Sequence, residues 1–131
     1  MPYVEVLAPR AAAAEKRQLT QAVTDGIVRG FGVAPSTVTI YFVPVGTDDY
    51  AHAGAFGLPP AGARVFVKLH AYRRNADQRR AVAEAMTPAL AACFDTPAHN
   101  VAIYFIDRER DEVAHEGHLA SDEALETSTT P

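Results

Sequence analysis

Hydrophobic and polar residues follow two different periods along this chain. Apolar residues recur at every second position in residues 3–7, which predicts a strand with two distinct faces. Residues 11–28 are rich in helix formers and predict a helix whose apolar residues recur at helical spacing, namely Leu19, Val23 and Ile27. The β-branched and aromatic run at residues 38–43 predicts a second strand. The first part of the chain therefore predicts a β-α-β unit.

The same order of elements returns in the second half of the chain. Strands are expected at residues 65–70 and 101–106, with a helix at residues 76–92 between them. Pro88 lies inside that helix, where it is expected to kink the helix or remove a hydrogen bond. A right-handed crossover makes the two strands of each unit parallel. Two such units predict an α+β fold, a four-stranded sheet with both helices on one face.

A comparison of the chain with itself indicates that one unit has been duplicated. At an offset of 63 positions, without a gap, identical residues coincide: Arg10 with Arg73, Arg17 with Arg80, Ile40 with Ile103, Tyr41 with Tyr104, Phe42 with Phe105, His52 with His115 and Gly54 with Gly117. We expect one domain over residues 1–131, with repeats at 2–56 and 65–119 and a turn-rich connector at 57–64. Residues 121–131, rich in Ser, Thr and Glu, predict a flexible tail.

Composition narrows the classes of partner. The formal net charge is -4 and basic residues are scattered along the chain, which argues against nucleic acid as a partner. The lone Cys93 excludes an internal disulfide framework and a zinc site of paired cysteines, and favours a reducing cytoplasmic location. No apolar run approaches the roughly 18 residues of a membrane span, so we expect a protein without membrane contact. The strands at 38–43 and 101–106 are apolar on both sides, which predicts oligomerisation.

Pro2 directly follows the initiator methionine. Removal of Met1, the usual fate of methionine before a small residue, would leave a secondary amine whose reference pKa as an α-amino group is about 8. A strand behind it would fix the nitrogen, and an apolar pocket would lower its pKa, which is typical of a general base or nucleophile. Alternatively, proline simply begins a strand. Val65 stands at the equivalent position of the second copy, where its nitrogen is an internal amide, so we expect one reactive centre per chain.

These features together resemble the tautomerase superfamily. The resemblance is carried by an N-terminal proline on a strand, a duplicated β-α-β unit, an arginine just before each helix and a glycine-containing segment after each second strand. Small members such as 4-oxalocrotonate tautomerase are single units, whereas longer members such as cis-3-chloroacrylic acid dehalogenase are fused pairs that form trimers. The resemblance therefore implies a homotrimer that acts on a small carboxylate substrate without a metal or other cofactor.

The dehalogenase branch of this family resembles the chain most closely around residues 69–77. The resemblance implies that Arg74 holds a substrate carboxylate, with Arg73 or Arg10 as its partner. Arginine suits this role because it forms two parallel hydrogen bonds with a carboxylate. The resemblance also places Tyr104 in the pocket, where it could donate a hydrogen bond to an enolate oxygen, although a structural role in the sheet is the alternative.

The position of the water-activating glutamate of that branch is occupied by His115, and Glu116 follows it. Either side chain could move a proton or place a water molecule. Ala71 and Ile27 stand where that branch has a second arginine and a histidine.

Three functions therefore remain open. In a tautomerase, a neutral Pro2 removes a proton from a 2-hydroxydienoate or a 2-keto acid and returns it to another carbon. In a hydratase or dehalogenase of unsaturated acids, a protonated Pro2 supplies a proton while Glu116 or His115 activates water. These two reactions require opposite protonation states of one nitrogen. The third possibility is a non-catalytic binding module on the same fold.

Overall fold

The computed structural model describes residues 2–123, and the two halves of the chain have the same order of elements except for one additional 3-10 turn in the second half. The first half contains β1 (Tyr3–Ala8), α1 (Ala13–Phe31), η1 (Pro35–Thr37), β2 (Thr39–Pro44), β3 (Ala51–His52) and β4 (Ala55–Phe56). The second contains β5 (Val65–Tyr72), α2 (Ala76–Cys93), η2 (Ala98–Asn100), β6 (Val101–Arg108), η3 (Arg110–Glu112), β7 (Ala114–His115) and β8 (His118–Leu119). In each half, a short 3-10 turn lies between the helix and the second main strand, and a two-stranded hairpin follows that strand.

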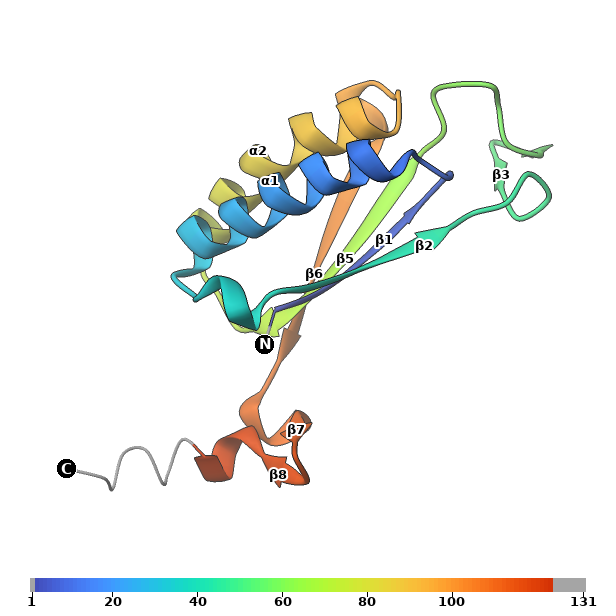
Figure 1. The fold of residues 1–131 in the computed structure, drawn as a ribbon. Coiled ribbons are helices and arrows are strands. Elements are labelled where there is room, and N and C mark those ends of the chain that lie inside the picture. The colour runs from blue at the N-terminus through green and yellow to red at the C-terminus, as the bar shows by residue number, and fades with distance from the viewer. Residues whose placement is uncertain (1, 124–131) are drawn as a thin grey trace.

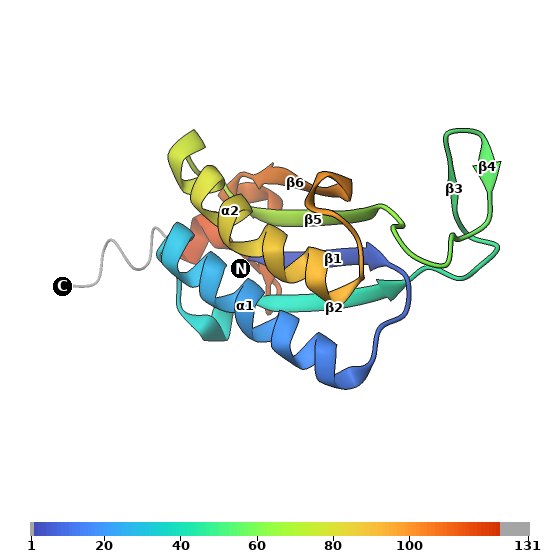
Figure 2. The same cartoon turned by 90° about the horizontal axis from the view of Figure 1, so that it is seen from above.

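The main sheet has the strand order β2-β1-β5-β6. Strands β1 and β2 are parallel, as are β5 and β6, and the two units join through the antiparallel pair β1 and β5. Both helices cover the same face of the sheet (Figures 1 and 2), which confirms the predicted architecture. Because β1 and β5 are antiparallel, the beginning of β1 lies beside the end of β5, with Tyr3 opposite His70.

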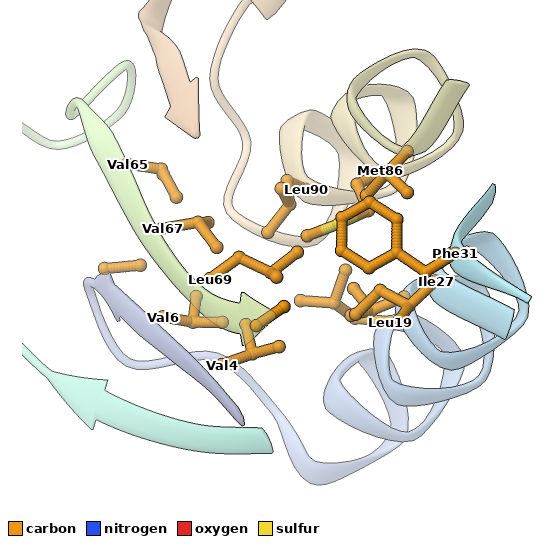
Figure 3. Close-up of a cluster of buried hydrophobic side chains, with 14 residues drawn as sticks. Val4, Val6, Leu19, Ile27, Phe31, Val65, Val67, Leu69, Met86 and Leu90 are labelled. Carbon is orange, nitrogen blue, oxygen red and sulfur yellow. The ribbon is translucent and has the colours of Figure 1, made fainter. Parts of the chain in front are cut away.

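The hydrophobic core fills the space between the sheet and the helices (Figure 3). Alternate residues of β1 and β5 are buried, as expected for strands with one face on the core. The helix residues predicted to be apolar contacts are all buried, namely Leu19, Val23 and Ile27. Their partners include Leu69, Met86 and Leu90, each no more than 1 % exposed.

The helix ends differ slightly from the predicted bounds. Helix α1 continues through Gly30 and ends at Phe31, and Gly32 follows in the left-handed conformation (φ 68°). The Gly32 N–H donates to the Val28 carbonyl, so Gly32 provides the C-cap of this helix. Pro88 lies within α2 and does not end that helix.

The predicted tail at residues 121–131 lies only partly within the described residues. Residues 120–123 are helical and Ala120 is buried, whereas the sequence placed residues 121–123 in a flexible tail. The rest of the expected tail, residues 124–131, lies outside the described residues. Among residues 2–123, no helix is both long and apolar enough to cross a membrane.

Gly30 of α1 packs tightly against α2. A Cβ atom at this position would lie 2.5 Å from Cγ2 of Val82, which is fully buried and has little room to move. Alanine favours a helix by about 1 kcal/mol over glycine, but overpacking typically costs about 1–3 kcal/mol. We expect Gly30→Ala to lower the free energy of unfolding by about 1–2 kcal/mol in urea denaturation.

The clash predicts a specific rescue. Adding Val82→Ala to Gly30→Ala should recover part of the lost stability, although Val82→Ala alone should be destabilising because it leaves a cavity. Additive effects of the two substitutions, or a stabilised Gly30→Ala protein, would contradict the close helix contact.

The sheet face opposite the helices is uncovered in the single chain (Figure 1). It exposes large side chains from three strands: Tyr41 of β2 is 57 % exposed, Phe66 of β5 39 % and Tyr104 of β6 55 %. We refer to this surface as the open sheet face. Such an extended aromatic surface is typical of a protein interface.

Candidate active site

A groove of about 1400 Å³ lies at the end of the sheet where β1 begins and β5 ends. Figure 1 shows the β7–β8 hairpin beyond this end of the sheet, whereas β3 lies beyond the opposite end. Residues from four parts of the chain line the groove, among them Pro2, Tyr3, Tyr41, Tyr72, Arg110 and His115. The groove thus combines Pro2, a cation and several aromatic rings.

Pro2 is held firmly at this groove. The residue is buried, and its carbonyl accepts a hydrogen bond of 3.1 Å from the N–H of Thr39 at the start of β2. Val4 and Val6 follow it in β1 and anchor the strand in the core. The fold therefore places the backbone of Pro2 without using its nitrogen in the sheet.

Arg74 does not line the groove of its own chain. Its guanidinium carbon lies 4.9 Å from the centroid of the Phe31 ring, at the end of α1 on the helix-covered side of the sheet. Its Nη1 also donates 2.9 Å to the carbonyl of Tyr72. These contacts hold the side chain against the fold, away from the open sheet face.

Arg73 is engaged in ion pairs at the end of β6. Its guanidinium lies 3.2 Å from Asp107 and 3.5 Å from Glu109. Arg79 of α2 donates to the same Asp107 carboxylate. That hydrogen bond from Arg79 is the main reason why the pKa of Asp107 is lowered, and the charge of Arg73 acts in the same direction.

The lowered pKa of Asp107 predicts an acid-dependent loss of stability. The unfolded chain binds a proton at Asp107 more readily than the folded one, so the stabilisation is present above the unfolded pKa and is lost as the pH falls through the folded pKa. We expect the difference in unfolding free energy between the wild type and Asp107→Asn to shrink below about pH 4. Urea denaturation at several pH values tests this, with the exposed Asp111→Asn as the control. A difference independent of pH would contradict it.

Arg10 and Tyr104 lie elsewhere on the chain. Arg10 follows the end of β1 and lines a smaller cavity of about 170 Å³ that also contacts Lys16, at the opposite end of the strand from Pro2. Tyr104 lies on the open sheet face, with its ring 6.0 Å from that of Phe66. Within one chain neither side chain lines the Pro2 groove.

His115 and Glu116, which were predicted to move a proton or place a water molecule, differ in their position relative to the groove. His115 ends β7 and lines the groove. Glu116 occupies the β7–β8 turn with a φ of 54°, is exposed, and is not among the lining residues. Only His115 is therefore brought to Pro2 within the chain.

Arg110 and Tyr72 line the groove but were not predicted from the sequence. The guanidinium carbon of Arg110 lies 4.5 Å from the centroid of the Tyr72 ring. At the repeat offset, Thr47 occupies the position of Arg110 and Pro9 that of Tyr72, so the duplication gave no signal for either residue.

A polar network connects the groove to the open sheet face. Nε2 of His70 lies 3.3 Å from the Glu5 carboxylate, and its Nδ1 lies 3.2 Å from a guanidinium nitrogen of Arg108. The hydrogen bond from His70 lowers the pKa of Glu5. Tyr3 stacks on His70 at 5.1 Å, and desolvation, followed by the charge of Glu5, raises its pKa. Tyr3 therefore keeps its hydroxyl proton at neutral pH.

Comparison with known proteins identifies solved structures that share this fold. No family model and no curated protein matches the sequence. The F6 fused 4-OT, solved as an asymmetric trimer, superposes with a TM-score of 0.83 at 20 % identity, over 92 % of this chain and 98 % of that one. Pt0534 inactivated by 2-oxo-3-pentynoate gives 0.81 at 21 % identity, with the same coverage.

A third solved structure belongs to the other branch that the sequence resembles. N1, a member of the cis-3-chloroacrylic acid dehalogenase family, superposes with a TM-score of 0.71 at 17 % identity, over 98 % of this chain and 92 % of that one. Likeness at this level of identity concerns the course of the backbone, which these proteins share over nearly their whole length. The chain therefore has the same fold as these proteins, which is the fold that its resemblance to the tautomerase superfamily implied.

Proposed function

We propose that the protein is a cofactor-independent tautomerase in which Pro2, exposed by removal of Met1, acts as a general base on a small 2-hydroxydienoate or 2-keto acid. The observation that supports this most is the place of Pro2, which is buried at the groove with its backbone fixed by Thr39. An apolar environment disfavours the charged form of an amine, and the proposal requires the Pro2 nitrogen of the processed chain to be neutral at physiological pH.

The proposed reaction moves one proton within the substrate. Neutral Pro2 takes the proton of the 2-hydroxyl group, the electron pair shifts along the conjugated chain, and Pro2 returns the proton to a carbon atom. No atom or electron is gained or lost. The aromatic walls supplied by Tyr3, Tyr41 and Tyr72 suit a planar conjugated acid.

We also propose that the active form is a homotrimer. The open sheet face exposes Tyr41, Phe66 and Tyr104, which an oligomer would cover. The similar fused 4-OT structures are described as trimers. In such an assembly Arg10, Arg74 or Tyr104, none of which lines the groove of its own chain, could line the groove of a neighbouring chain.

A hydratase or dehalogenase is the second candidate, and the position of His115 favours it. This side chain lines the groove with Pro2 and could hold a water molecule beside an unsaturated acid. In this reaction protonated Pro2 would deliver its proton to one carbon while the oxygen of the water molecule adds to the neighbouring carbon and the proton of the water passes to His115. Glu116 would have to rotate inward to assist.

The reactive nitrogen can be tested with 2-oxo-3-pentynoate, the compound that inactivates the structurally similar Pt0534. Its electrophilic alkyne should add once to each chain that lacks Met1, and peptide mass spectrometry should place the adduct on Pro2. A chain with lysine inserted between Met1 and Pro2 is the matched control, because its Pro2 nitrogen is an amide. No adduct, or the same adduct in the control, would favour a non-catalytic binding module.

A further inference from the structure

The Pro2 groove contains a cation that the predicted site did not include. Of the described residues that line the groove, Arg110 is the single arginine. The predicted arginines of the β5–α2 loop are already engaged, Arg73 with two carboxylates and Arg74 with backbone carbonyls and the Phe31 ring. Arg110 is therefore the arginine available to a substrate carboxylate in the groove.

The contact with Tyr72 leaves the hydrogen-bonding edge of Arg110 available. The guanidinium carbon lies 4.5 Å from the centroid of the Tyr72 ring, and a cation–π contact of this kind uses the charge of Arg110 without occupying its N–H donors. Within residues 2–123, no hydrogen bond or ion pair engages these donors. Planar donors in this arrangement match the two oxygens of a carboxylate.

The backbone that carries Arg110 is fixed from both sides. Glu109 and Glu112 form a reciprocal capping box around η3, with the Glu109 N–H donating 2.9 Å to the Glu112 carboxylate. Arg73 pairs with both Asp107 and Glu109, which ties this segment to the end of β5. Arg73 thus acts as a positioning residue for the turn on which Arg110 stands.

We propose that Arg110, supported by Tyr72, binds the carboxylate of the substrate in the Pro2 groove. This inference rests on the proposed function for its substrate, a planar 2-hydroxydienoate whose carboxylate lies at the Tyr72 side.

Steady-state kinetics of 2-hydroxy-2,4-pentadienoate ketonisation test the role of Arg110. Arg110→Ala should raise KM roughly 10- to 100-fold and leave kcat within about threefold, because it removes a charge-assisted bond made in both ground and transition states. Arg110→Lys should recover part of the affinity, since it restores charge without the planar fork. Arg80→Ala is the control, because Arg80 is exposed and pairs within its own helix.

Binding of sorbate separates this inference from the proposed function. Sorbate is a planar dienoate without the 2-hydroxyl group, so its affinity in calorimetry does not depend on turnover. Loss of sorbate affinity in Arg110→Ala, with normal affinity in Arg80→Ala, would support the carboxylate site even if no ketonisation were detected. Equal affinity of the wild type and Arg110→Ala would overturn the inference, whether or not the wild type is a tautomerase.

Discussion

Pro2→Ala is expected to lower kcat/KM for ketonisation of a 2-hydroxydienoate by at least about 100-fold, the usual contribution of a positioned general base. Alanine after Met1 removal still offers an amine, but a primary one, without the ring that fixes the nitrogen at the groove. The loss should appear mainly in kcat, because Pro2 is proposed to transfer the proton and not to bind the substrate carboxylate. Stopped-flow ultraviolet absorbance measures the rate directly.

A structural explanation of that loss can be excluded with a second proline. Pro9 is half-buried beyond the opposite end of β1, and Pro9→Ala should retain nearly full activity. The unfolding midpoints of Pro2→Ala and Pro9→Ala in urea should both stay near that of the wild type. If Pro2→Ala remained within about threefold of the wild-type rate, Pro2 would not be the general base.

Retention of Met1 should abolish activity more completely than any substitution of Pro2. The bond to Met1 turns the Pro2 nitrogen into a tertiary amide, which has no basic lone pair near neutral pH and no proton to give. Insertion of lysine between Met1 and Pro2 keeps that amide, because a bulky second residue prevents methionine removal. We expect its ketonisation rate to fall to the buffer level while its fold is retained.

The same argument gives a quantitative check on the wild type. In preparations with different degrees of processing, the rate per chain should be proportional to the fraction of chains that lack Met1, measured by intact mass. Activity in the lysine-inserted chain, or a rate independent of processing, would show that the reactive group lies elsewhere in the groove.

The fold followed from patterns that burial imposes on the sequence. Alternation in β1 and β5 and the helical spacing of Leu19, Val23 and Ile27 arise because one face of each element contacts the core. The repeat added the arrangement of the two units. The hairpins were missed because β3–β4 and β7–β8 have two residues per strand and expose nearly all their side chains, so they leave no periodic signal.

The site was harder to predict because side-chain direction depends on distant partners. The sequence placed Arg73 and Arg74 in the correct loop between β5 and α2, but Phe31 from α1 and Asp107 from β6 decide where their guanidinium groups lie. Arg110 carries no motif and no repeat equivalent. Its place at the groove depends on the direction that the chain takes after β6, which the local sequence does not determine.

The most direct test of the general-base role is the pH dependence of kcat/KM for ketonisation of 2-hydroxy-2,4-pentadienoate by the processed wild type. A neutral Pro2 base predicts a rate that rises with pH and levels off through a pKa below the reference of about 8 for an α-amino group, with this limb absent in Pro2→Ala. A rate that falls through that pKa would mean that the protonated amine is the active form, as in the hydratase candidate, and would contradict the tautomerase mechanism.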